Sequence, residues 1–459
     1  MSELTMAQAT EYAVSKLGAA GGVVVGEVSN SANLRWANSS LTTNGNTVEQ
    51  TLAIASFVQL SDGTACGLAS GQIRSKADID SLLEKSKASA LAAGVAEDAN
   101  DLIEGSAESN FADAPEDVDL SSLARIASEL GEVMSNREQE YFGYSEISTD
   151  TIYLATSTGI RNRFAQSTSR FELCAKSLDR TRSAWSGQSG SDLSGTAVAK
   201  HAATVNQGLD FQKNRIEIEP GRHKVTLSPS SVADLMIYLM WTASAREAAE
   251  GRSVFSGPVG GTRIGEQLTE RNLTLRTDPN HPGLKTIDRV ISMGNSTFGS
   301  TFDTGAKIDP VNLIDQGKLT ALGSSRFTAQ LAKLPFTPLA DNIVVTDEAG
   351  TGDLSELAKR MKDGLLITCL WYIREVDPQS LLLTGLTRDG VYVVKDGEII
   401  GAANNFRFNE SPVGMLKRII DAGESTYCLP REWADWFSRA QIAPLTIADF
   451  NLSTKSEAV

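Results

Sequence analysis

Residues 218–257 read IEPGRHKVTLSPSSVADLMIYLMWTASAREAAEGRSVFSG and place a turn, a strand and a long apolar helix in close succession. The strand is expected at His223–Leu227, directly after a Pro-Gly turn signal. Ser228 and Pro229 then fit a helix N-cap and the first helical position, which predicts a helix over 229–250. One face of that helix is apolar and carries Val232, Leu235, Met236, Leu239, Met240 and Ala243. A helix with such a face is expected to lie in a protein core.

Short β-rich runs separated by turn signals follow this helix. The expected strands include Asn272–Arg276, Leu365–Tyr372 and Gly390–Val394. Asp396-Gly397, between two such runs, has the signature of a tight hairpin. Helices are expected at Leu354–Met361 and Pro412–Ala422, and Trp371-Tyr372 is expected to lie in the core. The C-terminal part is therefore predicted to be mainly sheet.

The residues before this helix predict a helix–sheet–helix unit over about 1–95. Its expected strands are Gly22–Val28, Leu34–Trp36, Thr51–Leu60 and Thr64–Ser70, and a helix is expected at Lys76–Ala93. An acidic, weakly apolar stretch at 94–118 is interpreted as a linker or long surface loop. A helix at Leu120–Met134 and strands at Glu146–Thr156 and Phe171–Ser177 follow. Residues 185–209 give no clear prediction.

Together these elements predict an α/β (α+β) protein, in which an N-terminal helix–sheet–helix domain precedes a large, mainly β C-terminal domain. Because the length corresponds to two or three domains, we expect an N-terminal α/β domain at 1–113 and a central domain at 114–221. The C-terminal β-rich domain is expected at 222–459.

The composition is that of an ordinary globular protein. The chain has 459 residues, 42 basic and 57 acidic side chains, and therefore a net charge of −15. An acidic protein without a basic run repels phosphate backbones, so direct nucleic-acid binding is not expected. The longest apolar stretches, Leu235–Trp241 and Leu365–Ile373, are far shorter than the ~20 residues of a membrane-spanning helix, so no membrane partner is expected either.

The cysteines and the first residues indicate a cytoplasmic location. Cys66, Cys174, Cys369 and Cys428 are widely spaced and form no CxxC motif, which is typical of reduced, buried thiols. The first residues, MSELTMAQATEYAVSKLG, contain acidic side chains and lack the apolar core of a signal peptide.

No catalytic motif stands out along the chain. His201, His223 and His281 are far apart, and the sequence contains neither HxH nor HExxH. The glycine-rich run 257–265 lacks the GK[ST] of a P-loop and does not match GxGxxG. We interpret it as a tightly turned loop, with backbone contact to a ligand as the alternative. No GxSxG nucleophile elbow is present.

Two stretches give the sequence a recognisable pattern. The segment 218–257 quoted above, with its GRSVFSG ending, resembles the C-terminal domain of the TldD/PmbA family. The stretch from Arg388-Asp389-Gly390 through Asn404-Asn405-Phe406-Arg407-Phe408-Asn409-Glu410-Ser411 is similar to the family's hairpin and its NxRFNxS-like segment. The N-terminal unit, with Asp62-Gly63 before Cys66–Ser70, also resembles the family's first domain.

The resemblance implies a peptidase made of two homologous subunits. TldD-like subunits carry zinc on an HExxxH helix and a later cysteine, whereas TldE/PmbA-like subunits lack that motif. The motif's first His, Glu and second His align with Ile237, Tyr238 and Thr242, which cannot reproduce the ligand set, and Cys428 lies near the third ligand. The chain therefore resembles the TldE/PmbA-like branch, with no catalytic residue and no metal or other cofactor of its own.

The resemblance predicts a non-metal-binding subunit of a heterodimeric zinc metallopeptidase that cleaves unfolded or precursor peptides in an enclosed chamber. Its expected partners are a TldD-like homologous subunit, which carries the zinc, and an extended peptide. One alternative is a stand-alone peptide-binding or scaffold protein without peptidase function. The other is a self-sufficient hydrolase with a non-standard metal site, built from His223, His281 and Cys428.

Two groups of residues are the candidates for contact with substrate. One lies in the loop after the long helix and contains Arg252, Ser253, Gly257 and Gly260. The other is Asn405, Arg407 and Asn409. Arg252 and Arg407 could each hold a peptide carboxylate through two hydrogen bonds, with a structural ion pair as the alternative for both.

Overall fold

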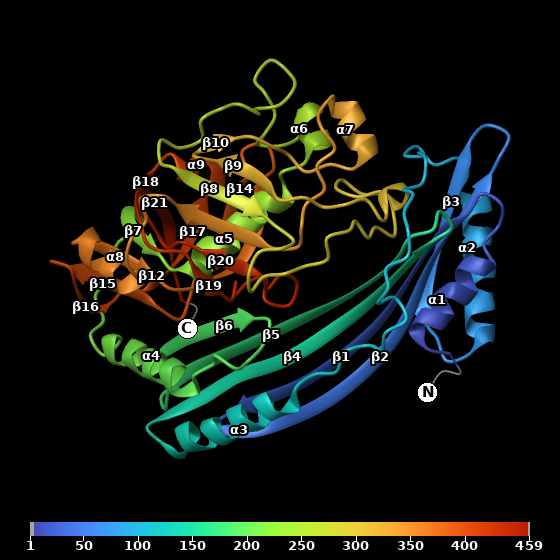
Figure 1. The fold of residues 1–459 in the computed structure, drawn as a ribbon. Helices are drawn as coiled ribbons and strands as arrows, with labels where there is room; N and C mark the ends of the chain where they lie inside the picture. Colours follow the sequence, from blue (N-terminus) through green and yellow to red (C-terminus); the bar gives the residue numbers. More distant parts are fainter. Residues whose placement is uncertain (1–3, 458–459) are drawn as a thin grey trace.

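A computed structural model describes residues 4–457 and contains a long curved sheet with the C-terminal half of the chain seated on one of its faces (Figure 1). The curved sheet is antiparallel, and its six strands follow the order β3-β2-β1-β4-β5-β6. The strands are β1 (Gly22–Ala37), β2 (Ser40–Gln59), β3 (Thr64–Gln72), β4 (Gln139–Thr156), β5 (Arg161–Ser177) and β6 (Ser183–Gly190). One sheet thus takes strands from both sides of residue 113.

Four helices cover one face of this sheet. Helices α1 (Met6–Ser15) and α2 (Lys76–Ala93) pack at one end of the sheet, and α3 (Leu120–Ser135) and α4 (Val198–Phe211) at the other. On β1 the even-numbered residues, from Val24 to Trp36, face these helices. The odd-numbered side chains therefore point to the opposite face, toward the C-terminal half.

Three of the strands predicted for this sheet are wrong in extent. Gly22–Val28 and Leu34–Trp36 belong to one strand, β1, because the polar residues between them pair with both β2 and β4. The strand predicted at Thr51–Leu60 begins at Ser40, since polar exposed residues extend the ladder with β1. Hydrophobic periodicity does not reveal a strand whose two faces are both polar.

The C-terminal half contains two further sheets, and the prediction of a mainly β region is confirmed. The larger has nine strands in the order β13-β14-β17-β21-β7-β12-β15-β16, with β18 paired to β21. These are β7 (Gly221–Leu227), β12 (Gly364–Ile367), β13 (Leu370–Asp377), β14 (Leu382–Thr387), β15 (Val391–Lys395), β16 (Glu398–Ala402), β17 (Asn405–Glu410), β18 (Ile419–Ala422) and β21 (Leu445–Ser456).

The smaller sheet has six strands in the order β10-β9-β8-β11-β20-β19. They are β8 (Leu273–Thr277), β9 (Val311–Asp315), β10 (Lys318–Leu319), β11 (Ile343–Asp347), β19 (Thr426–Cys428) and β20 (Ala440–Ile442). The short helices of this half are α6 (Ala245–Ala249), α7 (Arg326–Ala332), α8 (Leu354–Met361) and α9 (Pro412–Leu416). None of the helices within residues 4–457 combines the length and apolar character needed to cross a bilayer.

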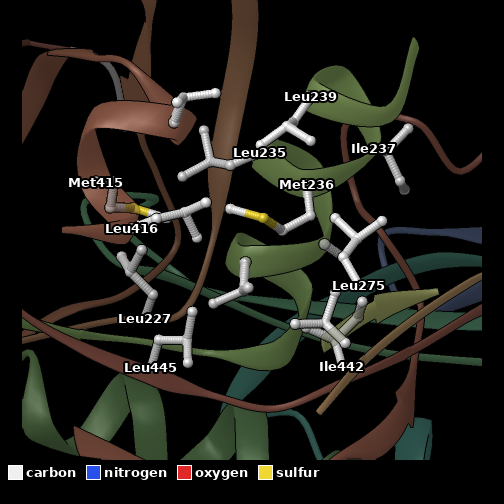
Figure 2. Close-up of a cluster of buried hydrophobic side chains, with 14 of the residues drawn as sticks. Leu227, Leu235, Met236, Ile237, Leu239, Leu275, Met415, Leu416, Ile442 and Leu445 are labelled. Carbon is white, nitrogen blue, oxygen red and sulfur yellow. The ribbon is translucent and has the colours of Figure 1, made fainter. Parts of the chain in front are cut away.

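Helix α5 (Pro229–Trp241) lies in the largest hydrophobic core, where its side chains meet those of both C-terminal sheets (Figure 2). The Ser228 side chain accepts a hydrogen bond from the N–H of Ser231, so the expected N-cap is confirmed. The helix ends earlier than predicted because Thr242 forms its C-cap and Ser244 caps the separate helix α6.

Three other expected elements differ from the structure. The run Leu365–Tyr372 is divided between β12 and β13, and the helix expected at Pro412–Ala422 ends at Leu416. Trp371 and Tyr372 are not core residues, since Tyr372 is 60% exposed and Trp371 stacks on a guanidinium group. The hairpin at Asp396-Gly397 is confirmed, and both residues have the positive φ that such a turn requires.

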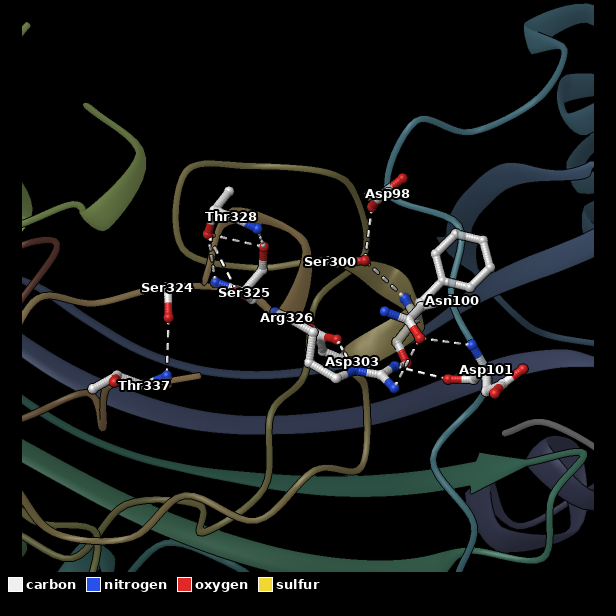
Figure 3. Close-up of polar contacts among 11 residues, drawn as sticks. Asp98, Asn100, Asp101, Ser300, Asp303, Ser324, Ser325, Arg326, Thr328 and Thr337 are labelled. Carbon is white, nitrogen blue, oxygen red and sulfur yellow. Dashed lines mark hydrogen bonds and ion pairs between the residues drawn. The ribbon is translucent and has the colours of Figure 1, made fainter. Parts of the chain in front are cut away.

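The curved sheet contacts the C-terminal half at both of its ends. At one end, residues 98–101 of the expected linker hydrogen bond with the segment around Ser300 and Arg326 (Figure 3). Arg326 forms a 2.6 Å ion pair with Asp303, which is itself buried. At the other end β6 contacts β19 and the residues after it. The C-terminal half therefore extends over the middle of the sheet's inner face and covers it only in part.

Candidate functional site

A groove lies between the inner face of the curved sheet and the segment 431–439, here called the covering segment. It consists of two adjoining cavities of about 450 and 210 Å³ that share Arg170 and Asp435 as lining residues. The sheet side is lined by Arg35, Phe142, Tyr144, Glu146, Ser148, Asp150, Thr168, Arg170, Glu172, Cys174 and Trp185. The covering segment contributes Arg431 and residues 434–439. The groove is large enough for several residues of an extended chain.

Strand alternation explains why charged side chains gather on this face. Tyr144, Glu146 and Ser148 alternate along β4 with residues that face the helices, and Arg170 and Glu172 do the same on β5. Arg170 lies 3.2 Å from Glu146, stacks on the Tyr144 ring at 4.6 Å, and pairs with Asp435 of the covering segment. The groove therefore offers charges of both signs rather than a uniform field.

Buried hydrogen bonds hold the covering segment in place. The Ser189 hydroxyl of β6 contacts the carbonyl oxygens of Cys428 and Ser438, at 2.8 and 2.6 Å. On the other side, Glu432 donates its backbone N–H to the carboxyl of Asp234 on α5, at 3.1 Å. The Glu432 carboxylate in turn accepts from the backbone N–H groups of Tyr372 and Ile373 at the start of β13. The segment thus connects α5, β6 and β13.

Arg431 is the charged centre of this arrangement. Its guanidinium lies between the rings of Trp185 and Trp371, at 5.0 and 5.1 Å from the ring centroids. It forms an ion pair with Asp389 and lies 2.8 Å from the sulfur of Cys369. A guanidinium with two aromatic faces and a carboxylate partner is held in one orientation.

The pKa values around Arg431 follow from burial and from its charge. Burial raises the pKa of the Asp389 carboxyl, but the charge of Arg431 and the Ser183 hydroxyl outweigh it and hold that pKa below its ordinary value. Burial raises the pKa of Cys174 and of Cys369 to about 12. Such thiols are protonated at neutral pH and are poor nucleophiles.

Asp234 is the one fully buried carboxyl on α5. Burial raises its pKa well above the ordinary value and outweighs the hydrogen bond from the N–H of Glu432. Its Oδ2 atom has no hydrogen-bond partner among the described residues. Burial also raises the pKa of Cys428, and Asp234 adds to that shift. Burial therefore favours the protonated form of both side chains.

The positions aligned with the zinc motif do not fit a zinc site. Ile237 has no ligating atom and is fully buried in the core. The Tyr238 ring packs against Trp433 at 5.6 Å and Trp241 at 6.4 Å. The Thr242 hydroxyl donates to the carbonyl of Leu239 at 2.9 Å. Within residues 4–457, no three His, Cys, Asp or Glu side chains are grouped so that they could hold a metal ion.

The first group of expected substrate residues lies in the loop after α6. Arg252 is exposed and pairs with Glu250. This contact is the structural ion pair that was the alternative to binding of a peptide carboxylate. Ser253 is buried and its hydroxyl accepts from the N–H of Phe255. Gly257 and Gly260 close a tight turn, in which Gly260 donates to the carbonyl of Gly257 and has a φ of +95°. These residues do not line the groove described above.

The second group lies on one face of β17. Asn405 borders a separate cavity of about 80 Å³ beside Asp389 and Arg215. Arg407 is exposed, 3.4 Å from the Thr384 hydroxyl, and the carbonyl of Asn409 accepts from the Asn451 side chain. Arg252 and Arg407 thus have different partners on different elements, and the structure does not bring them together.

The three histidines occupy separate surroundings. His201 is buried and 2.8 Å from the Ser186 hydroxyl, and burial lowers its pKa to about 4. His223 and His281 each lie 2.9 Å from a backbone carbonyl oxygen, of Glu219 and Pro282 respectively. Neither is grouped with Cys428 as a metal site within the described residues.

The sequence analysis did not identify the groove or its covering segment. One signal was available, since residues 433–437 read WADWF and place three aromatic residues in a short polar stretch. Trp433 contacts α5, whereas Trp436 is 79% exposed beside the groove. The inner face of the sheet gave no signal of its own, because its residues come from four different strands.

The fold and the family comparison together define a metallopeptidase-related protein. Residues 220–453, slightly more than half of the chain, match the family model described as the PmbA/TldA metallopeptidase C-terminal domain. The chain belongs to the PmbA/TldD family. A comparison with curated protein sequences gave no match.

Solved structures share the whole fold at low sequence identity. TldE from Thermococcus kodakarensis is 12% identical, with a TM-score of 0.76 over 97% of this chain and 98% of that chain. A proposed modulator of DNA gyrase from Bacteroides thetaiotaomicron is also 12% identical, with a TM-score of 0.74 over 97% and 98%. A second proposed modulator, from Thermotoga maritima, is 13% identical, with a TM-score of 0.73 over 94% and 95%. The chain is therefore similar in fold to these proteins over nearly its full length.

Proposed function

We propose that this chain is a TldE-like, non-metal-binding subunit of a heterodimeric, cytoplasmic zinc metallopeptidase. Its partner is a TldD-like homologous subunit that carries the zinc. The chain itself forms part of the wall that holds an extended, unfolded or precursor peptide. The observation that carries this proposal is a peptide-sized groove beside a helix whose zinc-motif positions hold no ligands.

The groove supports peptide binding better than it supports chemistry. Ser148 and Thr168 offer hydroxyl groups, and Glu146, Arg170 and Asp435 offer charges of both signs. A peptide backbone and mixed side chains could be held there without strong sequence preference. The thiol that lines the groove, Cys174, is a poor nucleophile, because burial raises its pKa to about 12.

Two further observations support the role of a non-catalytic subunit in the cytoplasm. Ile237, at the first position of the motif, is fully buried in the hydrophobic core and carries no ligating atom (Figure 2). All four cysteines are unpaired, as is usual in a reducing compartment. The zinc that polarises the peptide carbonyl would then be supplied by the partner.

The test is to purify the chain alone and after co-expression with a TldD-like protein. We expect no zinc and no proteolysis from the chain alone, and one zinc per heterodimer with proteolysis of an unfolded protein substrate. Metal analysis, native mass spectrometry and a peptide-cleavage assay measure these quantities. Stoichiometric zinc in the chain alone would contradict the proposal. Peptide binding by the chain alone, with no complex formed, would favour the stand-alone binding protein.

A variant inside the groove tests its part in the complex. Ser148→Trp places a large ring on the inner face of β4, and we expect peptide cleavage by the heterodimer to fall at least tenfold through a higher KM. Ser89→Trp, on the exposed surface of α2, is the matched control and should leave cleavage unchanged. If both variants cleave as the unchanged protein does, the peptide does not occupy this groove.

A further inference from the structure

One edge of the curved sheet is exposed over ten residues. Strand β2 pairs with β1 from Ser40 to Ser56, but on its other side β3 covers only Thr51–Gln59. Within residues 4–457, no strand pairs with the outer side of residues 40–49, and every side chain of that segment is exposed. We call residues 40–49 the free edge. An unpaired row of backbone N–H and C=O groups can bind another strand.

The free edge lacks the features that normally prevent such pairing. It contains no Lys, Arg or Pro, and Glu49 is its one charged residue. Leu41 and Val48 are 49% and 61% exposed, so apolar side chains accompany the unpaired backbone. The irregular register of this hairpin lies opposite Arg35 and Trp36, at its closed end, and leaves the rest of the edge regular.

The backbone direction along the free edge follows from a single hydrogen bond. The N–H of Ile73 donates to the carbonyl of Gln50 at 3.3 Å, so the backbone groups of Gln50 face away from β1. Because this direction alternates along a strand, the N–H and C=O groups of Val48, Asn46 and Asn44 also face outward. Those of Gly45 then face β1, where it pairs with Asn33.

Gly45 has no evident purpose within this chain. Its φ is not positive, and a Cβ atom there would meet only the Asn33 side chain, at 3.6 Å, which is an ordinary contact. Glycine weakens a strand and is typical of places where a second backbone approaches closely. The residues around it read Thr43-Asn44-Gly45-Asn46-Thr47, which is the same in both directions.

We propose that the free edge pairs antiparallel with the free edge of a second copy of this chain, about a two-fold axis at Gly45. Asn44 then lies opposite the partner's Asn46 in a hydrogen-bonded pair, and both residues have outward backbone groups. Thr43 lies opposite the partner's Thr47, and cross-strand threonine pairs are favourable. Glu49 lies opposite the partner's Leu41, so no like charges meet. This pairing does not depend on the proposed peptidase role.

The first test measures the mass of the purified chain by analytical ultracentrifugation. We expect twice the chain mass of 49.0 kDa for the unchanged protein and for Asn46→Ala, which keeps the backbone donor. Asn46→Pro removes that outward donor without touching the ladder to β1, and we expect the mass of one chain. A monomeric unchanged protein, or a dimeric Asn46→Pro variant, would overturn the proposal.

The second test determines the register of the two paired edges, and its result does not depend on dissociation of the dimer. At a non-hydrogen-bonded pair, opposite Cα atoms are about 4.5 Å apart, which permits a disulfide. We therefore expect Gly45→Cys to form a disulfide-linked dimer on a non-reducing gel under mild oxidation. Asn46→Cys is the control, since its two copies would be diagonal neighbours about 7–8 Å apart. Equal cross-linking of the two variants, or none of either, would refute the two-fold axis at Gly45.

Hydrogen exchange identifies the occupant of the edge. For the chain alone, we expect the amides of Asn44 and Val48 to exchange at least a hundredfold more slowly than in the Asn46→Pro variant, and the amide of Asn46 to be protected as well. If these amides exchange rapidly in the chain alone and become protected only with a TldD-like protein, the edge belongs to that partner and the proposal is wrong. This hydrogen-exchange result is independent of the zinc content that tests the proposed peptidase role.

Discussion

Arg431 and Asp389 form an ion pair that is buried where the nine-stranded sheet meets the curved sheet. Their side chains are 13% and 3% exposed, and Ser183 of β6 donates a hydrogen bond to the same carboxylate. Burial removes water from both charges, so the attraction between the two charges must offset the desolvation penalty of each. Both residues belong to the C-terminal half, and the hydrogen bond from Ser183 connects the pair to the curved sheet.

Removing one partner of this pair should cost far more than removing an exposed pair. We expect Arg431→Met to lower the free energy of unfolding by about 3–5 kcal/mol, because Asp389 would remain buried without a counter-charge. Arg252→Met, which breaks the exposed pair with Glu250, is the control and should cost about 0–1 kcal/mol. Urea unfolding followed by tryptophan fluorescence measures both. Equal losses would show that the buried pair is not a special contributor.

Stability should fall as the pH is lowered from about 6.5 to 4, and His201 should be a main cause. Its pKa is about 4 in the folded chain and 6.5 when it is free of burial, so in this window the unfolded chain binds the proton and the folded chain does not. The stabilising contribution is complete above pH 6.5 and is lost as the pH falls toward 4. Unfolding at several pH values should show this slope flattened in His201→Gln. His223→Gln, at a half-buried histidine whose ring lies beside the carbonyl oxygen of Glu219, should retain the slope.

Arg326 should determine how firmly residues 98–101 are held. It pairs with Asp303 and donates hydrogen bonds to the carbonyl oxygens of Asp101 and Phe302 (Figure 3). We expect Arg326→Gln to raise hydrogen exchange around residues 98–101 at least tenfold, while the strands of the curved sheet stay protected.

The control for Arg326 is Lys307→Gln, which breaks an exposed pair with Asp309 and should leave the same amides unchanged. Protection that is the same in Arg326→Gln and in the unchanged protein would show that the apolar contact of Phe57 with Phe302, at 4.6 Å, suffices to hold this end.

Restoring the zinc motif by substitution should fail. In Ile237→His/Tyr238→Glu/Thr242→His, the first imidazole would be placed in the hydrophobic core, where nothing in the described chain orients it toward a shared metal. We expect less than 0.1 zinc per chain by metal analysis, no proteolysis, and a lower midpoint of unfolding. Ile237→Met, which keeps the apolar volume, should unfold near the unchanged protein. One zinc per chain in the triple variant would contradict our description of this helix.

Local sequence signals predicted several elements correctly. The N-cap Ser228, the helix Lys76–Ala93 and the helix Leu354–Met361 are observed as expected. Capping residues, hydrophobic periodicity and turn pairs act over a few residues, so a single sequence reveals them. The family resemblance rested on two stretches of the C-terminal half, and the family is confirmed by the model that matches residues 220–453.

The candidate site could not be predicted in the same way. The groove brings Arg35, Arg170 and Arg431 to one surface from β1, β5 and the covering segment, which are more than a hundred residues apart in the chain. Trp371 was expected in the core because its strand is apolar, yet its ring lies on Arg431. Nothing in the local sequence around Trp371 indicates a partner sixty residues away.

The sequence by itself determined the position of the buried helix, the turns that separate the short strands, and the absence of His and Glu from Ile237, Tyr238 and Thr242. These properties depend on neighbouring residues or on side-chain identity alone. Only the tertiary structure decided that β1 and β2 extend through polar residues, that Asp234 and Arg431 are both buried, and that the groove exists. Long-range strand pairing and desolvation are properties of the folded chain, because they depend on which distant residues exclude water together.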